Sequence, residues 1–530
     1  MTTDNDKKTE EIKEPKQEPN QEPNQEPKEN PKQEPKQEPK QDKKQEPKQD
    51  KKQEPKQDKK QDKKQDKKQE EEYVRQTGSL RERLGRVKTT RWIRFGVVAL
   101  VYVLWTIWMG NPWLLLGLLL LGDIYLTQFI PWGAWKGWEK GPMRTLMSWI
   151  DAIVYALVLV YFLFLFIGQN YQIPSSSLEK SLLTGDFLWV NKVTYGPRVP
   201  QTPLHFPLAQ NTLPILNCKS YIDYPQLSYH RLKGLRNVER MDIVVFNFPA
   251  GDTVALKCPN PDYYTLCLER GRDVVRNNSE IFGEVVYRPV DRRDNYVKRC
   301  LGLPGENIQI KNGIVYINGK AVPQPKNVQY RYYVETDGTF IDDELFEELG
   351  ISNEDRLAVG AARYVLPLTS QMKKSLESKP WVKTVERIQP DPSETLYTYP
   401  VGTDYGWTHA DYGPVWIPKK GAKLDLTLEN LPLYERCIRN YEGNTLEVKG
   451  NQILINGKPA TSYTFKMDYY WMQGDNRDNS LDSRYWGFVP EDHIVGTPSI
   501  ILISFDKDHK LFDGGIRWNR IFKLPNPDKK

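Results

Sequence analysis

Residues 146–178, LMSWIDAIVYALVLVYFLFLFIGQNYQIPSSSL, join a long apolar run to a polar segment that contains three adjacent serines. The apolar part, 146–167, is close to the length of about 20 residues that a helix needs to cross the hydrocarbon of a bilayer. We therefore expect a transmembrane helix over 146–167. The last of the three serines, Ser177, lies about ten residues beyond that helix.

Two further apolar stretches precede this one, at 92–109 and 113–130. We expect both to be transmembrane helices, although each is short and Asp123 interrupts the second. One of them could instead be a buried or re-entrant helical segment. Asp123 is expected to face the helix bundle or a polar neighbour rather than to relay protons. About ninety polar residues precede the first stretch, which excludes a cleavable signal peptide at the N-terminus.

The distribution of basic residues predicts the orientation of these helices. A basic juxtamembrane segment, 73–91, precedes the first stretch, and residues 110–112 carry no charge. Basic residues before and at the start of the first stretch, and before the third, are Arg81, Arg83, Arg86, Lys88, Arg91, Arg94, Lys136, Lys140 and Arg144. The N-terminal side is therefore expected in the cytoplasm, and three crossings place everything after Ile167 outside it. If neither 92–109 nor 113–130 crossed the membrane, one crossing would remain, and the chain after Ile167 would still lie outside the cytoplasm.

The N-terminal 72 residues are a drifting repeat of Lys, Gln, Glu, Asp, Pro and Asn. Such a segment has no apolar periodicity to offset the entropy of ordering, so we expect a disordered, solvated spacer. The net charge of +6 is too small to imply a nucleic-acid partner. Five cysteines without a CxxC pair and five scattered histidines predict no metal site and no cofactor. Cys258 and Cys267 are near enough in sequence to form a disulfide.

Beyond Gly168 short alternating or β-branched stretches replace the helical runs, which indicates a mainly β region. Clear examples are 187–190, 243–248, 308–317 and 500–505. Two similar segments, NIQIKNGIVYINGK and TLEVKGNQILINGK, start at residues 307 and 445 and predict hairpins with Asn-Gly turns. We expect one β domain over 169–320 and 444–530. A second, β-rich domain with a helix near 342–349 is inserted over 321–443.

The three serines, taken alone, are more typical of a turn or cap than of a nucleophile. A catalytic serine needs a base, and the five histidines occur in no recognisable catalytic motif. Lys298 is the alternative, in the apolar segment 296–306, YVKRCLGLPGE. Burial lowers the pKa of a lysine and makes its amine a base at neutral pH. Spacing alone nevertheless favours ordinary ion-pair contacts for Lys298 and Arg299.

Four segments resemble, in order, the sequence boxes of bacterial type I signal peptidases, the serine/lysine endopeptidases of family S26. They are IPSSSL at 173–178, MDIVVFNFP at 241–249, YVKRCLGLPGE at 296–306 and GDNRDNSLDSRYWGFVP at 474–490. The resemblance leaves out residues 1–90 and most of 199–237, 251–295 and 321–443. Leu178 replaces the usual Met, and Glu179-Lys180-Ser181 replaces the usual x-Pro-Thr, so we expect altered pocket contacts rather than lost activity.

This resemblance implies a role for each matching residue. Ser177 is the nucleophile and Lys298 the general base. The Ser177 N–H and the Ser175 hydroxyl bind the oxyanion, and Ser480 hydrogen-bonds Lys298. Two ion pairs, Asp475 with Arg299 and Asp482 with Arg484, support the site, with ordinary surface ion pairs as the alternative. The residues that match the family's pocket for small side chains are Tyr171, Ile173, Leu182 and Val297.

The implied protein has N-terminal transmembrane helices, then a mainly β extracytoplasmic catalytic domain of the signal-peptidase and repressor-protease type, with an inserted β-rich domain. It would sit in the cytoplasmic membrane and cut signal peptides from exported preproteins after an A-x-A pattern. Its expected partners are those preproteins, the lipid bilayer and the secretion translocon. Two rival hypotheses are a self-cleaving repressor-type protease and an inactive envelope scaffold. Three spans and the 474–490 box weigh against the first, and intact Ser177, Lys298 and Ser480 against the second.

Overall fold

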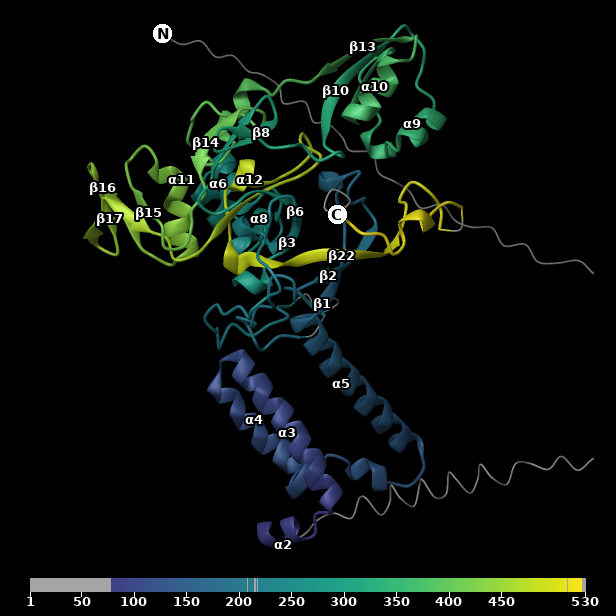
Figure 1. The fold of residues 1–530 in the computed structure, drawn as a ribbon, viewed down its shortest axis with the longest axis vertical. Coiled ribbons are helices and arrows are strands. Elements are labelled where there is room, and N and C mark those ends of the chain that lie inside the picture. Colours follow the sequence, from purple (N-terminus) through teal and green to yellow (C-terminus); the bar gives the residue numbers. More distant parts are fainter. Residues whose placement is uncertain (1–77, 207, 214–215, 217, 512, 527–530) are drawn as a thin grey trace, which may run out of the picture. The chain divides into compact units, whose positions relative to one another are not determined.

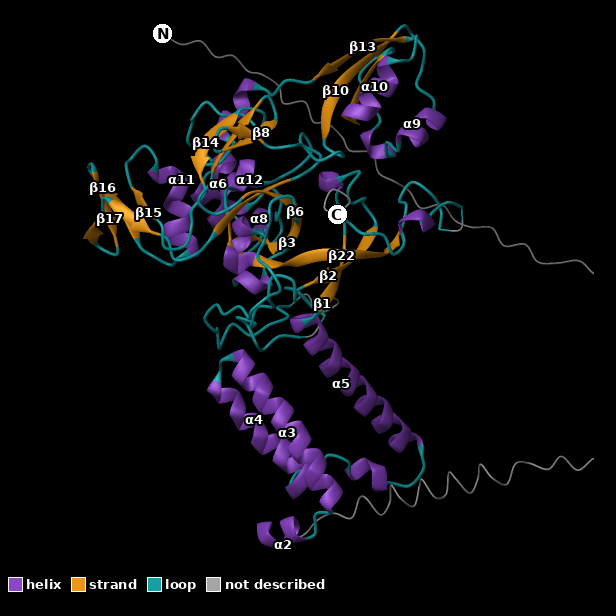
Figure 2. Ribbon diagram, viewed as in Figure 1, coloured by secondary structure: helices purple, strands orange, loops and turns teal. Residues whose placement is uncertain are grey.

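The structure is a computed structural model that describes residues 78–206, 208–213, 216, 218–511 and 513–526. The repeat expected to be disordered, 1–72, lies outside the described residues, as does the start of the basic segment 73–91. The described part opens with helices and continues as β-structure, in the order that the sequence predicts (Figure 2).

Two of the N-terminal helices, α3 (Thr89–Met109) and α5 (Pro142–Phe166), are long and apolar enough to cross a membrane. At about 1.5 Å per residue they measure about 31 and 37 Å. The middle stretch forms a shorter helical segment, Pro112–Thr127. It consists of η1 (Pro112–Leu116), α4 (Gly117–Gly122) and the π-turn η2 (Asp123–Thr127).

The segment Pro112–Thr127 folds back along α3 (Figure 1). At one end, Tyr102 Oη donates to Leu114 O at 2.7 Å. At the other end, Arg83 of the short helix α2 (Leu80–Gly85) donates to Thr127 O and Gln128 O, each at 3.1 Å. The chain therefore returns to the level at which α3 began.

Asp123, the first residue of η2, contacts polar neighbours, which is one of the two surroundings expected for it. Its carboxylate accepts hydrogen bonds from the backbone N–H groups of Phe129 and Ile130 at 2.6 and 3.1 Å. Thr127 Oγ1 and Trp132 Nε1 donate to the same carboxylate. Backbone amides that follow the helix thus find an acceptor within the chain.

The main sheet has seven antiparallel strands in the order β1-β2-β22-β3-β6-β20-β21. Its strands are β1 (Gly168–Gln172), β2 (Asp186–Asn191), β3 (Ile243–Asn247), β6 (Asn295–Gly302), β20 (Tyr469–Gln473), β21 (Val489–Pro490) and β22 (Ile494–Ser504). Shifts in register interrupt the pairing of β22 with β2 and β3 and that of β20 with β6. Such bulges increase local twist and bend a sheet. The strands expected at 187–190, 243–248 and 500–505 are confirmed within this sheet.

Both predicted hairpins are present. The first is formed by β7 (Asn307–Lys311), β8 (Ile314–Ile317) and β9 (Lys320–Ala321), the second by β16 (Leu446–Lys449), β17 (Gln452–Ile455) and β18 (Lys458–Pro459). Asn318-Gly319 and Asn456-Gly457 all have positive φ, between 49° and 78°. Asn and Gly tolerate that conformation, which closes two-residue hairpins.

Residues 329–387 form a four-stranded sheet with its own apolar core and the helices α9 and α10 (Figure 1). Its elements are β10 (Gln329–Thr336), α9 (Asp343–Leu349), β11 (Leu357–Ala358), β12 (Arg363–Thr369), α10 (Ser370–Glu377) and β13 (Val382–Arg387). The helix predicted near 342–349 is therefore confirmed as α9. The range 321–443 as one inserted domain stays a prediction.

Residues beyond 387 pack differently, because Tyr399 and Tyr412 share a core with Ile308 and Trp471. Strand β14 (Tyr412–Trp416) pairs with β7. The remaining helices and strands are β4 (Thr253–Ala255), α6 (Tyr263–Arg270), α7 (Arg272–Asn277), α8 (Ser279–Phe282), β5 (Val285–Tyr287), β15 (Lys423–Asp425), α11 (Leu431–Arg436), β19 (Ser462–Thr464) and α12 (Ser483–Trp486). The hypothetical Cys258–Cys267 disulfide is not formed, since both are free thiols.

The separate core of residues 329–387 predicts a local effect of mutation. Leu366 on β12 is fully buried, whereas Leu357 on β11 is 54% exposed. Leu366→Ala should destabilise this unit by about 2–5 kcal/mol through lost packing and a cavity. Hydrogen exchange followed by mass spectrometry should show faster exchange confined to 329–387. Leu357→Ala is the control, and equal effects of both substitutions would contradict the assignment of this core.

Candidate active site

The three serines lie in the loop that joins β1 to β2. Helix α5 ends at Phe166 and β1 begins at Gly168, so β1 and a few loop residues separate the helix from Ser177. Backbone hydrogen bonds Ile173 N to Asp186 O and Gly185 N to Ile173 O, both 2.9 Å, close the loop. Ser177 lies in the 3₁₀ turn η4 (Ser176–Leu178) and is 7% exposed. The turn thus holds one hydroxyl in a buried, defined position.

Lys298 projects from β6, which lies between β3 and β20. Its Nζ is 2.6 Å from Ser177 Oγ, and the side chain is 5% exposed. Burial lowers the pKa of Lys298 to about 8, and Arg484 adds to that shift while the carboxylates of Asp482 and Asp475 oppose it. With a pKa of 8, about one amine in ten is neutral at pH 7. The structure therefore brings together a buried hydroxyl and an amine that can accept its proton.

Two buried ion pairs flank this contact. Arg299 donates from Nε and Nη2 to the two oxygens of Asp475 at 2.8 and 2.7 Å. Arg484 binds both oxygens of Asp482 in the same way, each at 2.8 Å. All four side chains are at most 1% exposed. The alternative of ordinary surface ion pairs is wrong, because neither pair reaches solvent.

The two supporting serines lie differently from each other. Ser175 precedes η4 and is exposed, beside the buried Ser177. Ser480 is 8% exposed and close to Gly474, where an added Cβ would meet its Oγ at 2.2 Å. The expected hydrogen bond from Ser480 to Lys298 is not formed: among the described residues, the Ser480 hydroxyl has no hydrogen-bond partner.

No role was predicted from the sequence for two asparagines. Both form hydrogen bonds with the turn that carries Ser177, which we call the nucleophile turn. Asn476 N donates to Ser177 O at 3.1 Å, and its side chain donates to Ser176 O at 3.2 Å. Asn479 Nδ2 donates to Ser176 Oγ at 3.0 Å. Both belong to the segment 474–490, which matches a family box. That match was the feature of the sequence from which their role could have been predicted.

A second missed set of contacts joins this turn to residues 329–387 and the segment before them. Lys180 Nζ donates to Leu349 O at 2.9 Å and also to Gly350 O, at the end of α9. Asn327 Nδ2 donates to Lys180 O at 3.0 Å. Lys180 lies where the chain departs from the family pattern, and nothing in the sequence indicates its distant partner.

The four residues expected to line the substrate pocket belong to one apolar cluster. Ile173 and Leu182 are buried at 3% and 0% exposure. Tyr171 and Val297 pack against them and are only partly buried. The structure thus brings the four together, with Tyr171 and Val297 as the members accessible from outside.

Histidines take no part in this contact. Among the described residues, no histidine hydrogen-bonds Ser177. His493 instead lies beside Asp492 and Arg293, and burial lowers its pKa to about 4. No cluster of three or more potential metal ligands is found among the described residues. The reactive groups that this contact brings together are the Ser177 hydroxyl and the Lys298 amine.

A buried serine beside a lysine on a bent β-sheet defines a serine endopeptidase of the serine/lysine class. The family model of signal peptidase, peptidase S26, matches residues 146–382 and 460–503, which is more than half of the chain. The chain belongs to this family.

Curated relatives of this chain carry the name signal peptidase I. The protein of Buchnera aphidicola subsp. Acyrthosiphon pisum is 25% identical over 361 residues, 67% of this chain and 74% of that protein. The protein of Buchnera aphidicola subsp. Baizongia pistaciae is 24% identical over 420 residues, 78% and 93% of the two chains. The Haemophilus influenzae protein is 23% identical over 382 residues, 72% and 76%.

Loss of one partner of a buried ion pair should be costly. Asp475→Ala leaves the guanidinium of Arg299 without its carboxylate, which should destabilise the domain by about 3–5 kcal/mol. Glu447→Ala removes a partner of Lys449 that is 62% exposed, and should change stability by less than about 1 kcal/mol. Chemical denaturation followed by tryptophan fluorescence measures both. Similar midpoints for the two variants would contradict a structural role for Asp475.

Proposed function

We propose that Ser177 and Lys298 are the nucleophile and the general base with which this signal peptidase removes signal peptides from exported preproteins. The observation that carries the proposal is the 2.6 Å contact between Lys298 Nζ and Ser177 Oγ inside a buried site. A distance of 2.6 Å lies within the range required for direct proton transfer. The catalytic step needs no histidine and no metal.

In the first step, neutral Lys298 takes the hydroxyl proton while Ser177 Oγ bonds to the scissile carbonyl carbon. The protonated amine then donates that proton to the leaving nitrogen as the peptide bond breaks. The products are the mature protein's free amino terminus and an acyl ester on Ser177. Lys298, neutral again, takes a proton from water as the water oxygen bonds to the ester carbon. The protonated amine then returns this proton to Ser177 Oγ as the ester C–O bond breaks, and the signal peptide leaves with a carboxyl terminus.

The oxyanion formed in each attack needs hydrogen-bond donors at the position where negative charge develops. We assign the Ser177 backbone N–H and the Ser175 hydroxyl to this role. Ser175 is exposed and adjacent to the nucleophile turn, so its hydroxyl can rotate toward a bound carbonyl.

Specificity for small residues before the cut follows from the apolar cluster beside Ser177. Ile173 and Leu182 are buried in this cluster, and Tyr171 and Val297 are its partly exposed members. A small side chain can pack against these residues with less displacement than a large one. This arrangement supports cleavage after an A-x-A pattern.

Placement in the cytoplasmic membrane is the remaining part of the proposal. The returning segment Pro112–Thr127 brings the chain back to the level of Arg83, so α5 crosses in the same direction as α3. With the basic 73–91 segment in the cytoplasm, the tail is cytoplasmic and the β domain extracytoplasmic. The preproteins would then arrive from the translocon with their own apolar helix in the bilayer.

Cleavage of a preprotein with an A-x-A site tests the proposed residues. Purified wild type should cut after the second Ala, and Lys298→Met should lower kcat/KM by roughly 10²–10⁴-fold because the general base is lost. Ser177→Ala should remove the acyl-enzyme route altogether. Mass spectrometry of the products locates the cut.

Lys458→Met, in an exposed position on β18, is the matched control and should cleave like wild type. Near-normal activity of folded Lys298→Met would show that another group is the base. Failure of folded wild type to cut several such preproteins would favour the scaffold hypothesis.

The pKa of Lys298 also predicts the pH dependence. Only the neutral amine accepts a proton, so kcat/KM should rise with pH and level off above about 8. The substrate should have no titratable residues near the cut, so that the dependence of kcat/KM on pH reports the ionisation of the enzyme alone. A profile that falls between pH 7 and 9 would be inconsistent with Lys298 as the base.

A further inference from the structure

A cavity of about 300 Å³ lies where α5 meets the β domain. One wall is apolar and comes from the last turns of α5, with Tyr161, Phe164 and Leu165. The lining also includes three basic side chains, those of Lys192, Arg198 and Arg292. The cavity thus combines the end of a membrane-spanning helix with a cluster of cations.

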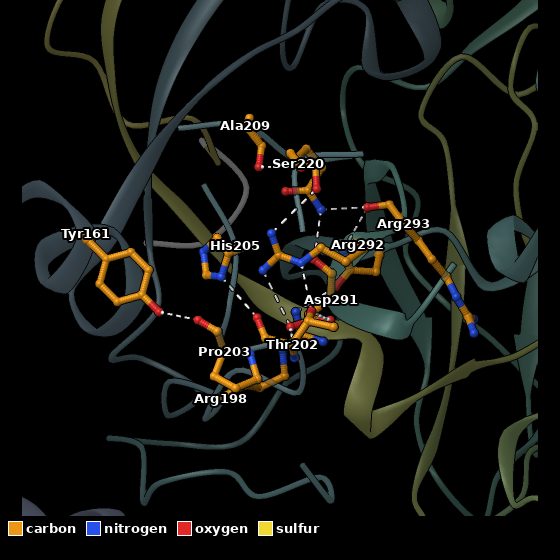
Figure 3. A network of polar contacts seen from close by, with 12 residues as sticks. Tyr161, Arg198, Thr202, Pro203, His205, Ala209, Ser220, Asp291, Arg292 and Arg293 are labelled. Atoms are coloured by element: carbon orange, nitrogen blue, oxygen red, sulfur yellow. Dashed lines mark hydrogen bonds and ion pairs between the residues drawn. The ribbon is translucent and has the colours of Figure 1, made fainter. Parts of the chain in front are cut away.

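Positive charge exceeds negative charge in this cavity. Asp291 is its lining carboxylate, and it already accepts hydrogen bonds from Thr202 N and Oγ1 at 2.9 and 2.6 Å. Arg292 Nε also donates to Thr202 Oγ1, at 2.9 Å, and its Nη2 lies 3.5 Å from Asp291 (Figure 3). The nearby carboxylate of Asp492 is hydrogen-bonded to His493. The lining therefore has three basic side chains and one carboxylate, which already has hydrogen-bond partners and pairs with Arg292.

Lys192 is held against the end of the helix. Its Nζ donates to Phe164 O at 2.6 Å and to Gln169 Oε1 at 3.2 Å, which are both neutral acceptors. Burial and the positive charges of Arg198 and Arg292 lower the pKa of Lys192 to about 7. An anion beside the three cations would relieve this mutual repulsion.

The segment around the cavity has an apolar outer surface. Leu204, Phe206, Leu208, Ile222 and Tyr224 are between 50% and 80% exposed. The same segment packs on the helices, since Val199 and Leu232 form a buried cluster with the helix ends at Met109 and Phe166. Exposed apolar side chains at the level of two helix ends are typical of a surface that lies in a membrane interface.

We propose that this cavity binds the phosphate of an anionic phospholipid, with the acyl chains along Phe164 and Leu165 of α5. The inference rests on the membrane placement given under Proposed function. The three basic side chains complement the negative charge of a lipid phosphate. The apolar residues of α5 favour a ligand with acyl chains over a free anion. Tyr171 lines the cavity and also packs against the proposed substrate pocket, so the bound lipid lies next to that pocket.

Native mass spectrometry of the full-length protein in detergent tests the proposal without relying on catalysis. We expect phosphatidylglycerol to bind more tightly than phosphatidylcholine. Lys192→Gln should weaken phosphatidylglycerol binding by roughly 10- to 100-fold, as expected for one lost charge-assisted hydrogen bond. Lys192→Arg should retain it. Lys233→Gln, an exposed lysine of the same segment outside the cavity, is the matched control and should bind like wild type.

A second variant, Ala209→Phe, fills the cavity without removing a charge and should also abolish binding. It keeps the test decisive if Lys192→Gln does not fold, which thermal unfolding would reveal. Phosphatidylglycerol binding that survives both variants would overturn the proposal. Binding of inorganic phosphate or glycerol phosphate as tight as that of the lipid would also overturn it, in favour of a free-anion site.

A third contrary result would be a preference for preproteins with an acidic residue near the cut that Lys192→Gln removes. The cavity would then belong to the substrate site rather than to a lipid. Cleavage of the A-x-A preprotein by the same wild-type preparation separates these outcomes from failure of the proposed function, because lipid binding and cleavage are measured independently.

Discussion

Burial of the Lys298 amine beside Ser177 is the constraint on which the rest of the catalytic domain depends. Lowering the pKa from 10.5 to about 8 costs the folded state about 3 kcal/mol near neutral pH, because the unfolded chain still binds the proton there. That cost decreases as the pH rises from 8 toward 10.5. The stability of the surrounding sheet must therefore offset the cost of burying the Lys298 amine. The strand that carries Lys298, β6, lies inside this sheet between β3 and β20.

The segment 474–490 connects the parts of the site that are distant in sequence. Asp475 binds Arg299 on β6 and accepts a hydrogen bond from Ser181 at 2.7 Å, while Asn476 holds the carbonyl of Ser177. Strand β10 joins the same segment, because Gln329 N donates to Asp475 O at 2.9 Å. A displacement of this segment would thus change the turn that carries Ser177 and the strand that carries Lys298 together.

The position of the site relative to α5 links the chemistry to the membrane. Ser177 follows the last residue of α5, Phe166, by only a short strand and turn, so the nucleophile cannot move far from that helix end. A signal peptide is itself an apolar helix, and its cleavage site emerges near the same surface. Val199 and Leu232 pack on the ends of α3 and α5, at Met109 and Phe166.

Local patterns in the sequence determined the apolar helices, the alternating strands, both Asn-Gly hairpins and α9, because each depends on residues close together in the chain. The family boxes singled out Ser177 and Lys298 and predicted both ion pairs, Asp475 with Arg299 and Asp482 with Arg484. Spacing alone favoured surface contacts for Lys298, and only the tertiary structure places its amine 2.6 Å from the hydroxyl in a buried site. The tethers from Asn476 and Lys180 and the cationic cavity also required the fold, since each joins segments whose separation in sequence carries no periodic signal.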